Sequence, residues 1–538
     1  MLNRANRFAF ITVTPQYAVS IAMLHVFCKS RPTYDLLNYG TIGRREATYM
    51  MTMVETTTGP IEGREKDGTF FFAGIPYAAA PTESKRFRRA QAHEPWSEVL
   101  TTKKIGAAAP QLPGSGLSDA PSVRWDENCL TLNITTPGTT SGRRPVLIWI
   151  HGGAYRTGQG GIPWYNGARF ALHGDMVVVS INYRLGALGF TDLSTFGTEY
   201  EFSGINGLLD QLLALEWVQE NIERFGGDPT KVTIAGESAG GFSVSTLLGM
   251  PATNGLYRHA IPQSGAAHHT LPGEAGKLVA DTFLQELDAD GPVQFMAASA
   301  EQILQAQRQT ITKLETPDTR ETLGVSVSAF YPVVGNSLLP ESPLDAIRAG
   351  VGSDVAVMTG SNHHETTLWG YEDQINDSQL ERRAREMGDE NLLQRYRNAR
   401  PNDSATDLMT AISTDFMFRI PAIRLLEARP YTERNWLYQF NWESRAFSGN
   451  LKATHALEIP FAFDNLDQAG VDNFIGPGPT PQHVADRMHR AWIEFICDGN
   501  PGWASYSSEA RNTMIFDDES GQITDPESQE RNAWEGIR

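Results

Sequence analysis

Three short runs of apolar residues recur between residues 144 and 236, each bounded by glycine or polar residues. The first run is Val146–Ile150, the second lies in DMVVVSINYRLG at 175–186, and the third lies in KVTIAG at 231–236. Runs that are apolar at consecutive positions are typical of parallel strands buried on both faces. Leucines at helical spacing between the second and third runs predict a helix that stops at Gly226. Strand, helix and strand in this order predict an α/β fold with a large, mostly parallel central sheet flanked by helices.

Beyond residue 236 the pattern continues with more widely spaced strands. Polar, helix-like segments predict a helical cap insertion around 273–350. Val355–Thr359 and the segment NWLYQFNWES at 435–444 predict two further strands. A long helix is expected to begin just after Pro481 and to stop at Gly499. The last residues of the chain, about 20 in number, are polar and predict a frayed tail.

Residues 1–53 do not share this pattern. Phe8–Cys28 carries no Asp, Glu, Lys or Arg and is preceded by two arginines, as in a signal peptide or a membrane anchor. Polar residues dilute its apolarity, and no cleavage motif of small residues follows. The alternative is a poorly ordered or non-native leader, with translation starting at a methionine near residue 50. We therefore expect a leader over 1–53 and a single domain over 54–538.

The composition excludes several classes of function. The 538 residues carry a formal net charge of −18, which argues against a nucleic-acid partner because phosphate binding needs clustered Lys and Arg. Three cysteines cannot build a disulfide framework. The sequence contains no CxxC, HExxH or phosphate-cradling GxxxxGK motif. We therefore expect neither a metal nor a cofactor.

The third apolar run ends in the sequence GESAG, with Ser238 between Gly236 and Gly240. A strand is expected over Val232–Ala235 and a helix over Gly241–Met250, so Ser238 lies at the turn between them. Flanking glycines relieve the strain of a sharp turn, and a serine there projects above the edge of the sheet. The start of the helix places N–H groups near developing negative charge. These features favour a nucleophile over an ordinary turn residue.

A serine hydroxyl is a poor nucleophile unless a base takes its proton. In sheets of this type the partners follow in the order Ser, acid, His. Only His455, His483 and His489 lie far enough downstream to follow an acid. The last two fall on the amphipathic terminal helix, where surface or packing roles are expected. His455 lies in a loop before an apolar run and is the candidate base by elimination.

The acid should end a strand between Ser238 and His455. Glu365 closes the loop after the strand Val355–Thr359, whereas Asp354 lies at the wrong end of that strand. Asp373 and Asp415 remain alternatives on spacing alone.

Acyl transfer also needs donors for an oxyanion. The sequence HGGAY follows the strand that ends at Ile150 and offers backbone N–H groups at Gly152 and Gly153. Ala239, the residue after the candidate nucleophile, offers a third. Beside such a serine, the Gly-Gly pair favours an oxyanion hole over a plain turn.

Taken together, these motifs resemble the type-B carboxylesterase family, which includes the cholinesterases and fungal lipases. The resemblance extends from about residue 58 to about residue 506. It rests on FAGIPYAAAP followed by RF, ENCLTLNI, IHGGAY, NYRLGALGF, FGGDP with VTIAGESAGG, QSG at 263–265, and ATHALEIPFAF. The resemblance implies an α/β-hydrolase fold and hydrolysis of carboxylic esters through an acyl-enzyme.

The resemblance also implies roles for individual residues. Ser238 matches the family's nucleophile, His455 its base and Glu365 its acid. The oxyanion hole corresponds to three residues, namely Gly152, Gly153 and Ala239. Glu237 and Glu458 match family positions near the site, where they are expected either to stabilise the imidazolium or to form a structural hydrogen-bonded pair.

The sequence departs from the family pattern at three places, which bear on the acid, on a disulfide and on the substrate. The sequence NHHETT around Glu365 has neither the usual acidic residue before the glutamate nor the glycine after it. No upstream cysteine matches the usual partner of Cys129, so the disulfide of the animal members is expected to be absent. The segment 109–129 has no tryptophan at the place expected for choline binding, which argues against a cholinesterase.

The sequence therefore predicts a serine carboxylesterase. Hydrolysis of carbamates or amides by the same triad is the enzymatic alternative, because these compounds present a similar acyl carbon. A non-catalytic, neuroligin-like binding protein is the alternative of another class. We expect a small-molecule ester substrate, no stable membrane association, and either a monomer or a homo-oligomer. The lack of disulfides suggests a cytoplasmic bacterial protein, or a secreted one if residues 1–28 act as a signal peptide.

Overall fold

The computed structural model describes residues 51–113, 123–140, 142–314, 328–370 and 374–537. Residues 48–538 form one compact unit. The leader expected over 1–53 lies outside the described residues except for its last three, of which Met53 begins the first strand.

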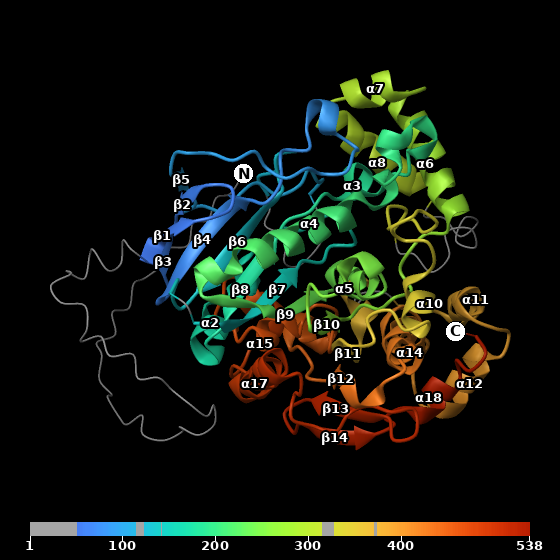
Figure 1. Cartoon of the computed structure of the whole chain (residues 1–538). Helices are drawn as coiled ribbons and strands as arrows, with labels where there is room; N and C mark the ends of the chain where they lie inside the picture. Colours follow the sequence, from blue (N-terminus) through green and yellow to red (C-terminus); the bar gives the residue numbers. More distant parts are fainter. Residues whose placement is uncertain (1–50, 114–122, 141, 315–327, 371–373, 538) are drawn as a thin grey trace, which may run out of the picture. The chain divides into compact units, whose positions relative to one another are not determined.

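A large mixed sheet dominates the compact unit (Figure 1). Within the described residues it has eleven strands in the order β14-β13-β12-β11-β10-β9-β7-β8-β6-β4-β3. The strands from β13 to β8 run parallel to one another, and antiparallel pairs close the sheet at both edges. In chain order they are β3 Arg64–Lys66, β4 Thr69–Pro76, β6 Thr131–Thr136, β7 Arg144–Ile150, β8 Val177–Ile181, β9 Gly227–Glu237, β10 His259–Gln263, β11 Ala356–Asn362, β12 Asn435–Phe440, β13 Asn512–Phe516 and β14 Gly521–Thr524. A small second sheet contains β1 Met53–Glu55, β2 Pro60–Glu62 and β5 Leu100–Thr101.

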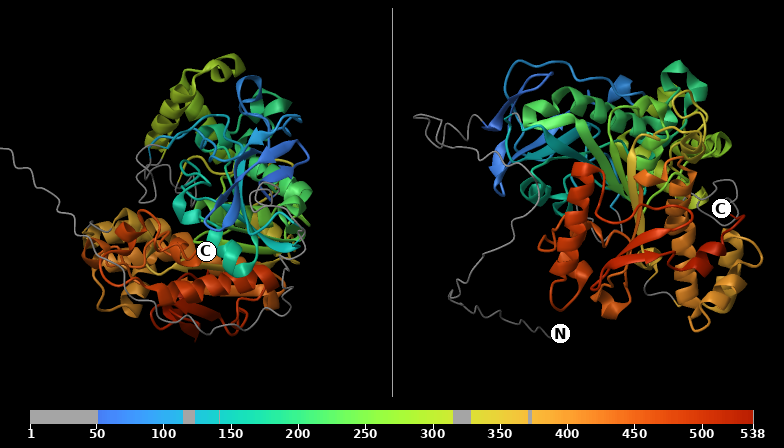
Figure 2. Two further views of the ribbon diagram at one scale, coloured as in Figure 1. Left: turned by 90° about the vertical axis from the view of Figure 1, so that its left-hand side faces the viewer. Right: turned by 60° about the horizontal axis from the view of Figure 1, so that its bottom comes forward.

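Helices cover both faces of the large sheet (Figures 1 and 2). They are α2 Ala168–Gly174, α3 Gly186–Phe190, α4 Asn206–Asn221, α5 Ala239–Leu248, α6 Gly273–Leu287, α7 Pro292–Ala297, α8 Ala300–Leu314, α10 Pro343–Arg348, α11 Asp377–Met387, α12 Leu392–Ala399, α13 Ala405–Thr414, α14 Ile420–Ala428, α15 Ile459–Ala462, α16 Val471–Ile475, α17 Gln482–Asp498 and α18 Ser528–Asn532. The expected α/β architecture, a large and mostly parallel sheet between helices, is confirmed.

The consecutive apolar residues of β7 explain why this strand lies in the middle of the sheet. Val146, Ile148 and Ile150 pack into one core together with α4 and α5. Leu147 and Trp149, which point the other way, pack into a second core with α2, α15 and α17. A strand whose side chains alternate between two cores needs apolar residues at every position. The parallel centre of the sheet then directs the carboxyl ends of β7, β9 and β11 toward one edge.

The segment between β10 and β11 contains α6, α7 and α8, within the range expected for a cap insertion. Helices α6 and α8 pack against each other, and α8 also contacts α3. Figure 1 shows these helices at one end of the sheet rather than over its faces. The part of α8 that includes Gln307, Arg308 and Ile311 borders the main pocket.

The prediction of a frayed C-terminal tail was wrong. β14 pairs with β13, and α18 follows it. Trp534 is fully buried, and its indole N–H donates a hydrogen bond of 2.7 Å to the hydroxyl of Tyr396. The polar composition of the segment concealed this order because its charged residues are themselves paired: Arg531 donates to Asp525, and Glu530 accepts from Arg400.

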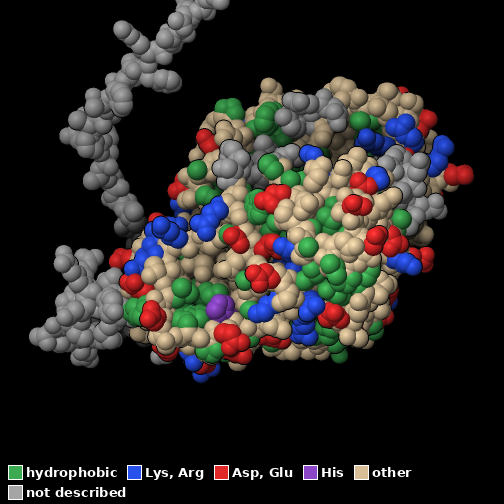
Figure 3. All heavy atoms as spheres, turned by 90° about the horizontal axis from the view of Figure 1, so that it is seen from above, with side chains coloured by type: hydrophobic (Ala, Val, Ile, Leu, Met, Phe, Trp, Pro, Cys, Tyr) green, Lys and Arg blue, Asp and Glu red, His purple; other side chains and the backbone are tan. Residues whose placement is uncertain are grey.

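The described surface is mixed in character. On the face drawn in Figure 3, acidic and basic side chains occur together with small apolar patches between them. Of the helices that the structure describes, none is both long enough and apolar enough to cross a membrane.

Candidate active site

Ser238 occupies the turn between β9, which ends at Glu237, and α5, which begins at Ala239. Its backbone angles are φ 56° and ψ −123°, and its N–H donates to the carbonyl of Gln263 on β10 at 3.0 Å. A positive φ is uncommon for a residue with a side chain and persists only where the surroundings enforce it. The strained turn therefore holds the serine at the carboxyl edge of the sheet.

Gly236 and Gly240 are required by the close approach of β7 to this turn. A Cβ atom on Gly236 would lie 2.5 Å from the carbonyl oxygen of Ile150, and one on Gly240 would lie closer still. Real Cβ atoms do not approach backbone that closely, so both positions exclude every other residue. The GxSxG pattern is thus a packing requirement as well as a turn signal.

Two backbone segments beside Ser238 supply candidate oxyanion donors. A Cβ atom on Gly152 would lie 3.1 Å from the Cβ of Ser238, so the glycine loop after β7 lies directly against the serine. Gly153 has φ +109°, and its carbonyl accepts hydrogen bonds from the N–H groups of Arg156 and Thr157, which fix the loop. Ala239 is the first residue of α5, where the N–H has no partner within the helix.

His455 lies in the loop between β12 and α15 and reaches back to Glu365. Its Nδ1 is 2.5 Å from Oε2 of Glu365, and its backbone N–H donates to the carbonyl of Glu365 at 3.2 Å. Oε1 of Glu365 accepts a hydrogen bond of 2.8 Å from the backbone N–H of Asn362, the last residue of β11. Because a carboxylate only accepts, Nδ1 carries the proton and Nε2 is the nitrogen that faces away from Glu365.

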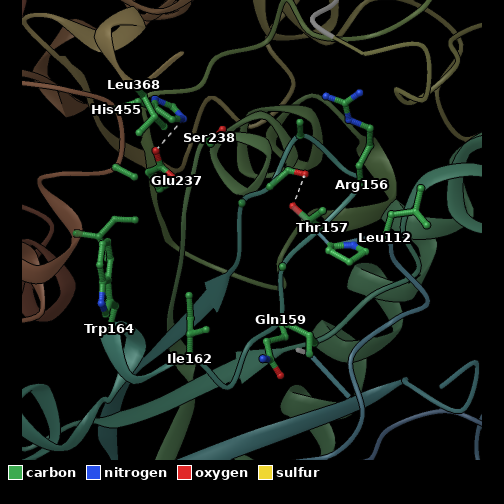
Figure 4. A pocket seen from close by; sticks show the side chains of 18 of the residues that line it. Leu112, Arg156, Thr157, Gln159, Ile162, Trp164, Glu237, Ser238, Leu368 and His455 are labelled. Carbon is green, nitrogen blue, oxygen red and sulfur yellow. Dashed lines mark hydrogen bonds and ion pairs between the residues drawn. The ribbon is translucent and has the colours of Figure 1, made fainter. Parts of the chain in front are cut away.

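A second carboxyl group approaches the other side of the imidazole. Nε2 of His455 is 3.1 Å from Oε1 of Glu237, the residue before Ser238. Figure 4 shows His455, Glu237 and Ser238 together on one side of a pocket, with Leu112 and Arg156 on the opposite side. The sequence indicated that Glu237 is near the site but did not indicate this contact.

Glu458 is held behind the same histidine by two amide groups. Nδ2 of Asn362 donates to Oε2 of Glu458 at 2.7 Å, and Nε2 of Gln263 donates to Oε1 at 3.2 Å. The indole N–H of Trp492 donates to the side-chain oxygen Oε1 of Gln263 at 3.0 Å and so orients that amide. No role for Asn362 or Gln263 was predicted from the sequence. Each is the last residue of a strand, β11 and β10, at the edge of the sheet where the catalytic residues were expected.

The pKa values of His455, Glu237 and Glu458 are shifted by burial and by the charges of neighbouring groups. Burial alone would lower the pKa of His455, but the nearby carboxylates of Glu237 and Glu365 outweigh it and raise that pKa to about 9. Burial, with a further contribution from Glu365, raises the pKa of Glu458 to about 7. Burial also raises the pKa of Glu237 well above its usual range, although His455 opposes this shift. A protonated imidazole is thus strongly stabilised at this position.

A cavity of about 460 Å³ opens in front of Ser238. Its apolar wall comes from several separate segments, and Gly152, Gly153, Glu237, Ser238 and His455 form its floor. The apolar residues of the wall include Leu112, Ile162, Trp164, Tyr165, Leu368, Trp369, Ile459 and Phe474.

The rival acids and bases have other partners. Asp415 is buried in an ion pair with Arg419 and accepts a hydrogen bond from Tyr396, while Asp373 lies outside the described residues. His483 is exposed beside Asp518, and His489 is buried on the opposite side of α17. Of the described candidates, only Glu365 and His455 come together beside Ser238.

Comparisons with known proteins agree on one family. The model of the carboxylesterase family matches residues 51–534. The para-nitrobenzyl esterase of Bacillus subtilis (strain 168) is 36% identical over 492 residues, covering 89% of this chain and 97% of its own. Phenmedipham hydrolase of Pseudarthrobacter oxydans is 32% identical and covers 88% of this chain and 96% of its own. The crystal structure of a Geobacillus stearothermophilus carboxylesterase superimposes with a TM-score of 0.80 at 34% identity, covering 90% of this chain and all of that one.

Proposed function

This chain belongs to the carboxylesterase family and is a carboxylic ester hydrolase of type B, and on this premise we propose which residues perform the hydrolysis. Ser238 is the nucleophile, His455 the general base and Glu365 the acid that orients the imidazole. Gly152, Gly153 and Ala239 form the oxyanion hole. The observation that carries the proposal is the 2.5 Å contact between Nδ1 of His455 and Glu365 beside the strained Ser238 turn.

In the first half of the reaction, Oγ of Ser238 attacks the acyl carbon while Nε2 of His455 takes the hydroxyl proton. The N–H groups of Gly152, Gly153 and Ala239 donate to the oxyanion of the tetrahedral intermediate, each worth about 2.7–4 kcal/mol. The imidazolium then gives its proton to the leaving alcohol, and the acyl-enzyme forms. In the second half, a water molecule attacks the acyl-enzyme through the same proton transfers, and the carboxylic acid product is released.

Glu237 and Glu458 are supporting residues in this mechanism. Both are buried near His455, and their carboxyl groups favour the charged imidazole that forms during each proton transfer. Because Oε1 of Glu237 faces Nε2, Glu237 also influences how readily the free enzyme releases that proton. The two glutamates thus adjust the pKa of the base through their charge.

The shape of the pocket supports esters that carry an aromatic or bulky apolar group. Trp164, Trp369 and Phe474 line it, and the side chain of Trp369 is itself 56% exposed. The Bacillus subtilis relative is named for para-nitrobenzyl esters, which agrees with such a wall. Carbamates and amides are the second class to assay, and the relative named phenmedipham hydrolase makes that compound a further substrate to try.

The decisive experiment compares the wild-type enzyme with Ser238→Ala on p-nitrophenyl butyrate. We expect kcat to fall by about 10⁴–10⁶-fold while circular dichroism shows an unchanged fold. Ser378→Ala, which changes an exposed serine on α11, serves as the control and should retain full activity. Equal activity of Ser238→Ala and the wild type would overturn the assignment of the nucleophile.

We also propose that residues 54–538 act as a single catalytic domain, with the insertion around 273–350 bordering the pocket through α8. A cytoplasmic location is supported by the small number of cysteines, since three cysteines cannot build the disulfide framework typical of small secreted domains. Activity measured in separated cytoplasmic and extracellular fractions of the native host tests this location.

A further inference from the structure

A second cluster of titratable side chains lies on the other side of the sheet from α5. His173 is in the last turn of α2, His489 is in the middle of α17, and Asp464 follows α15. Nδ1 of His173 is 3.3 Å from Nε2 of His489 and 4.0 Å from Oδ2 of Asp464. One ligand atom from each residue lies within 4.8 Å of the other two.

The surroundings orient two of these side chains. Nδ1 of His489 lies 2.8 Å from the carbonyl of Ala462 and must donate to it, so the lone pair of the neutral ring is on Nε2. Phe170 packs against the same ring, with 4.5 Å between the centroids. Nε2 of Gln482 donates to Oδ1 of Asp464 at 2.6 Å, which leaves Oδ2 directed toward the histidines. Ring orientation by a carbonyl acceptor is the arrangement commonly seen behind metal-bound histidine.

We propose that His173, His489 and Asp464 bind a divalent transition-metal ion of the Zn²⁺ type. Two imidazole nitrogens and one carboxylate oxygen are donors that Zn²⁺, Ni²⁺ and Co²⁺ accept, whereas Ca²⁺ and Mg²⁺ prefer oxygen alone. With bonds of about 2.0–2.1 Å, ligand atoms of a tetrahedral Zn²⁺ site lie about 3.3–3.4 Å apart. The two histidine nitrogens already have this spacing, and a small rotation of Asp464 brings in the third ligand.

The site is accessible and its imidazoles suit a metal. The side chain of His173 is 53% exposed, so an ion can enter from solvent and keep a water molecule as its fourth ligand. The ring nitrogen Nε2 of His489, which does not face the carbonyl of Ala462, is directed toward His173 and is available as a ligand atom. A bound ion would connect α2, α17 and the segment after α15, which are distant in the sequence.

Arg169 is the group that opposes metal binding. Its Nε is 3.9 Å from Oδ2 of Asp464, and its guanidinium also donates to the backbone carbonyl of Asp464. The carboxylate of Asp467 accepts from Nη2 of Arg169 at 2.8 Å and offsets part of its charge. The alternative to a metal site is a hydrogen bond from Nδ1 of His173 to Nε2 of His489. In that arrangement the carboxylate of Asp464 forms an ion pair with Arg169.

The test is a titration of untagged, EDTA-dialysed enzyme with Zn²⁺ by calorimetry and with Co²⁺ by visible absorption. We expect one ion per chain. His173→Ala should weaken binding by at least about tenfold, because even outer-shell changes at metal sites cost 10–100-fold. Asp464→Asn should weaken it as well, and Arg169→Gln should strengthen it. Because His173 is exposed, its replacement should not disturb the fold, and esterase activity without metal should be unchanged.

His483→Ala is the matched control, because it removes an exposed histidine from the same helix α17. It should bind Zn²⁺ like the wild type. If the wild type binds no ion, or if His173→Ala binds as tightly as the wild type, the proposal is wrong and the cluster is only a hydrogen-bonded pair. Bound Co²⁺ should also raise the thermal unfolding temperature of the wild type but not of His173→Ala.

Discussion

His455 and His489 are buried to almost the same extent, with 3% and 4% of their surfaces exposed, yet their pKa values shift in opposite directions. Burial lowers the pKa of His489 to about 4, because nothing charged beside it outweighs the loss of hydration. For His455 the same burial is outweighed by Glu237 and Glu365, and the pKa rises to about 9. The charge of a buried histidine is therefore decided by its carboxylate neighbours.

The two regions also differ in where those neighbours come from. Around His455, Glu237 ends β9, Glu365 follows β11, and Glu458 precedes α15. Around His489, the nearest acid is Asp464, and the guanidinium of Arg169 lies close to it. The first region is thus suited to holding and releasing a proton. The second keeps its ring neutral.

The largest expected difference between the two regions is the effect on kcat when each histidine is replaced in turn. We expect His455→Ala to reduce kcat by about 10⁴–10⁶-fold, because the nucleophile loses its base. His489→Ala should change kcat by less than about threefold and act mainly on stability. Steady-state kinetics on p-nitrophenyl butyrate, with folding checked by circular dichroism, measures both. Comparable losses of kcat in the two folded variants would contradict the assignment of the base.

The next largest effect is expected for Glu365→Gln. The amide has one acceptor oxygen, whereas Glu365 uses two, for the N–H of Asn362 and for Nδ1 of His455. It also leaves the imidazolium without its charged partner, so kcat should fall by about 10³–10⁴-fold. Glu458→Gln is the matched change of another buried glutamate, and its effect should be much smaller. If Glu458→Gln were the more damaging variant, the acid of the triad would have to be reassigned.

The contribution of Glu237 can be isolated through the pH profile. Hydrolysis needs neutral His455, so kcat/KM rises with pH as the imidazolium loses its proton. Glu237 raises the pKa of His455, and replacing it by Gln should therefore lower that pKa and move the rising limb of kcat/KM to lower pH, by about 1–2 units. The control Glu443→Gln, at an exposed position, should leave the limb in place. A limb that moves to higher pH would contradict the electrostatic role.

The smallest expected effect concerns stability in acid. The pKa of His489 is depressed in the folded state, so its contribution to stability is present above the unfolded value near 6.5 and is lost as pH falls toward about 4. Between pH 7 and pH 5 this loss amounts to about 2 kcal/mol. Urea unfolding in the presence of EDTA should show a correspondingly smaller loss for His489→Gln than for the wild type. An identical loss in both proteins would show that His489 titrates normally.

The turn at Ser238 and the glycine loop at Gly152 could be predicted from the sequence, because residues adjacent in the chain determine both. A strand, a serine between two glycines and a helix define the turn at Ser238, and a glycine pair directly after a strand marks the loop at Gly152. Strand direction favoured Glu365, because it follows a strand whose end had to face the same edge, but spacing alone left Asp373 and Asp415 as alternatives.

What could not be predicted depends on contacts between distant segments. The approach of Glu237 to Nε2 of His455 and the amide groups behind Glu458 require the finished sheet. Sequence reasoning also missed the ordered C-terminus, because Trp534 is buried against Tyr396, 138 residues away. The contact of His173 with His489 spans 316 residues and has no sequence signature.

The order of strands in the sheet has a consequence for folding kinetics. Glu365 and His455 are separated by 90 residues, and the strands that carry Ser238 and Glu365 are neighbours only through β10. A parallel pairing of this kind must close a long loop, with a loss of chain entropy, before its contacts stabilise it. Such pairings therefore form slowly. Helices such as α4 and α17 need no such pairing to begin forming. Esterase activity in a refolding chain is therefore a late signal, which reports that the sheet from β9 to β12 is complete.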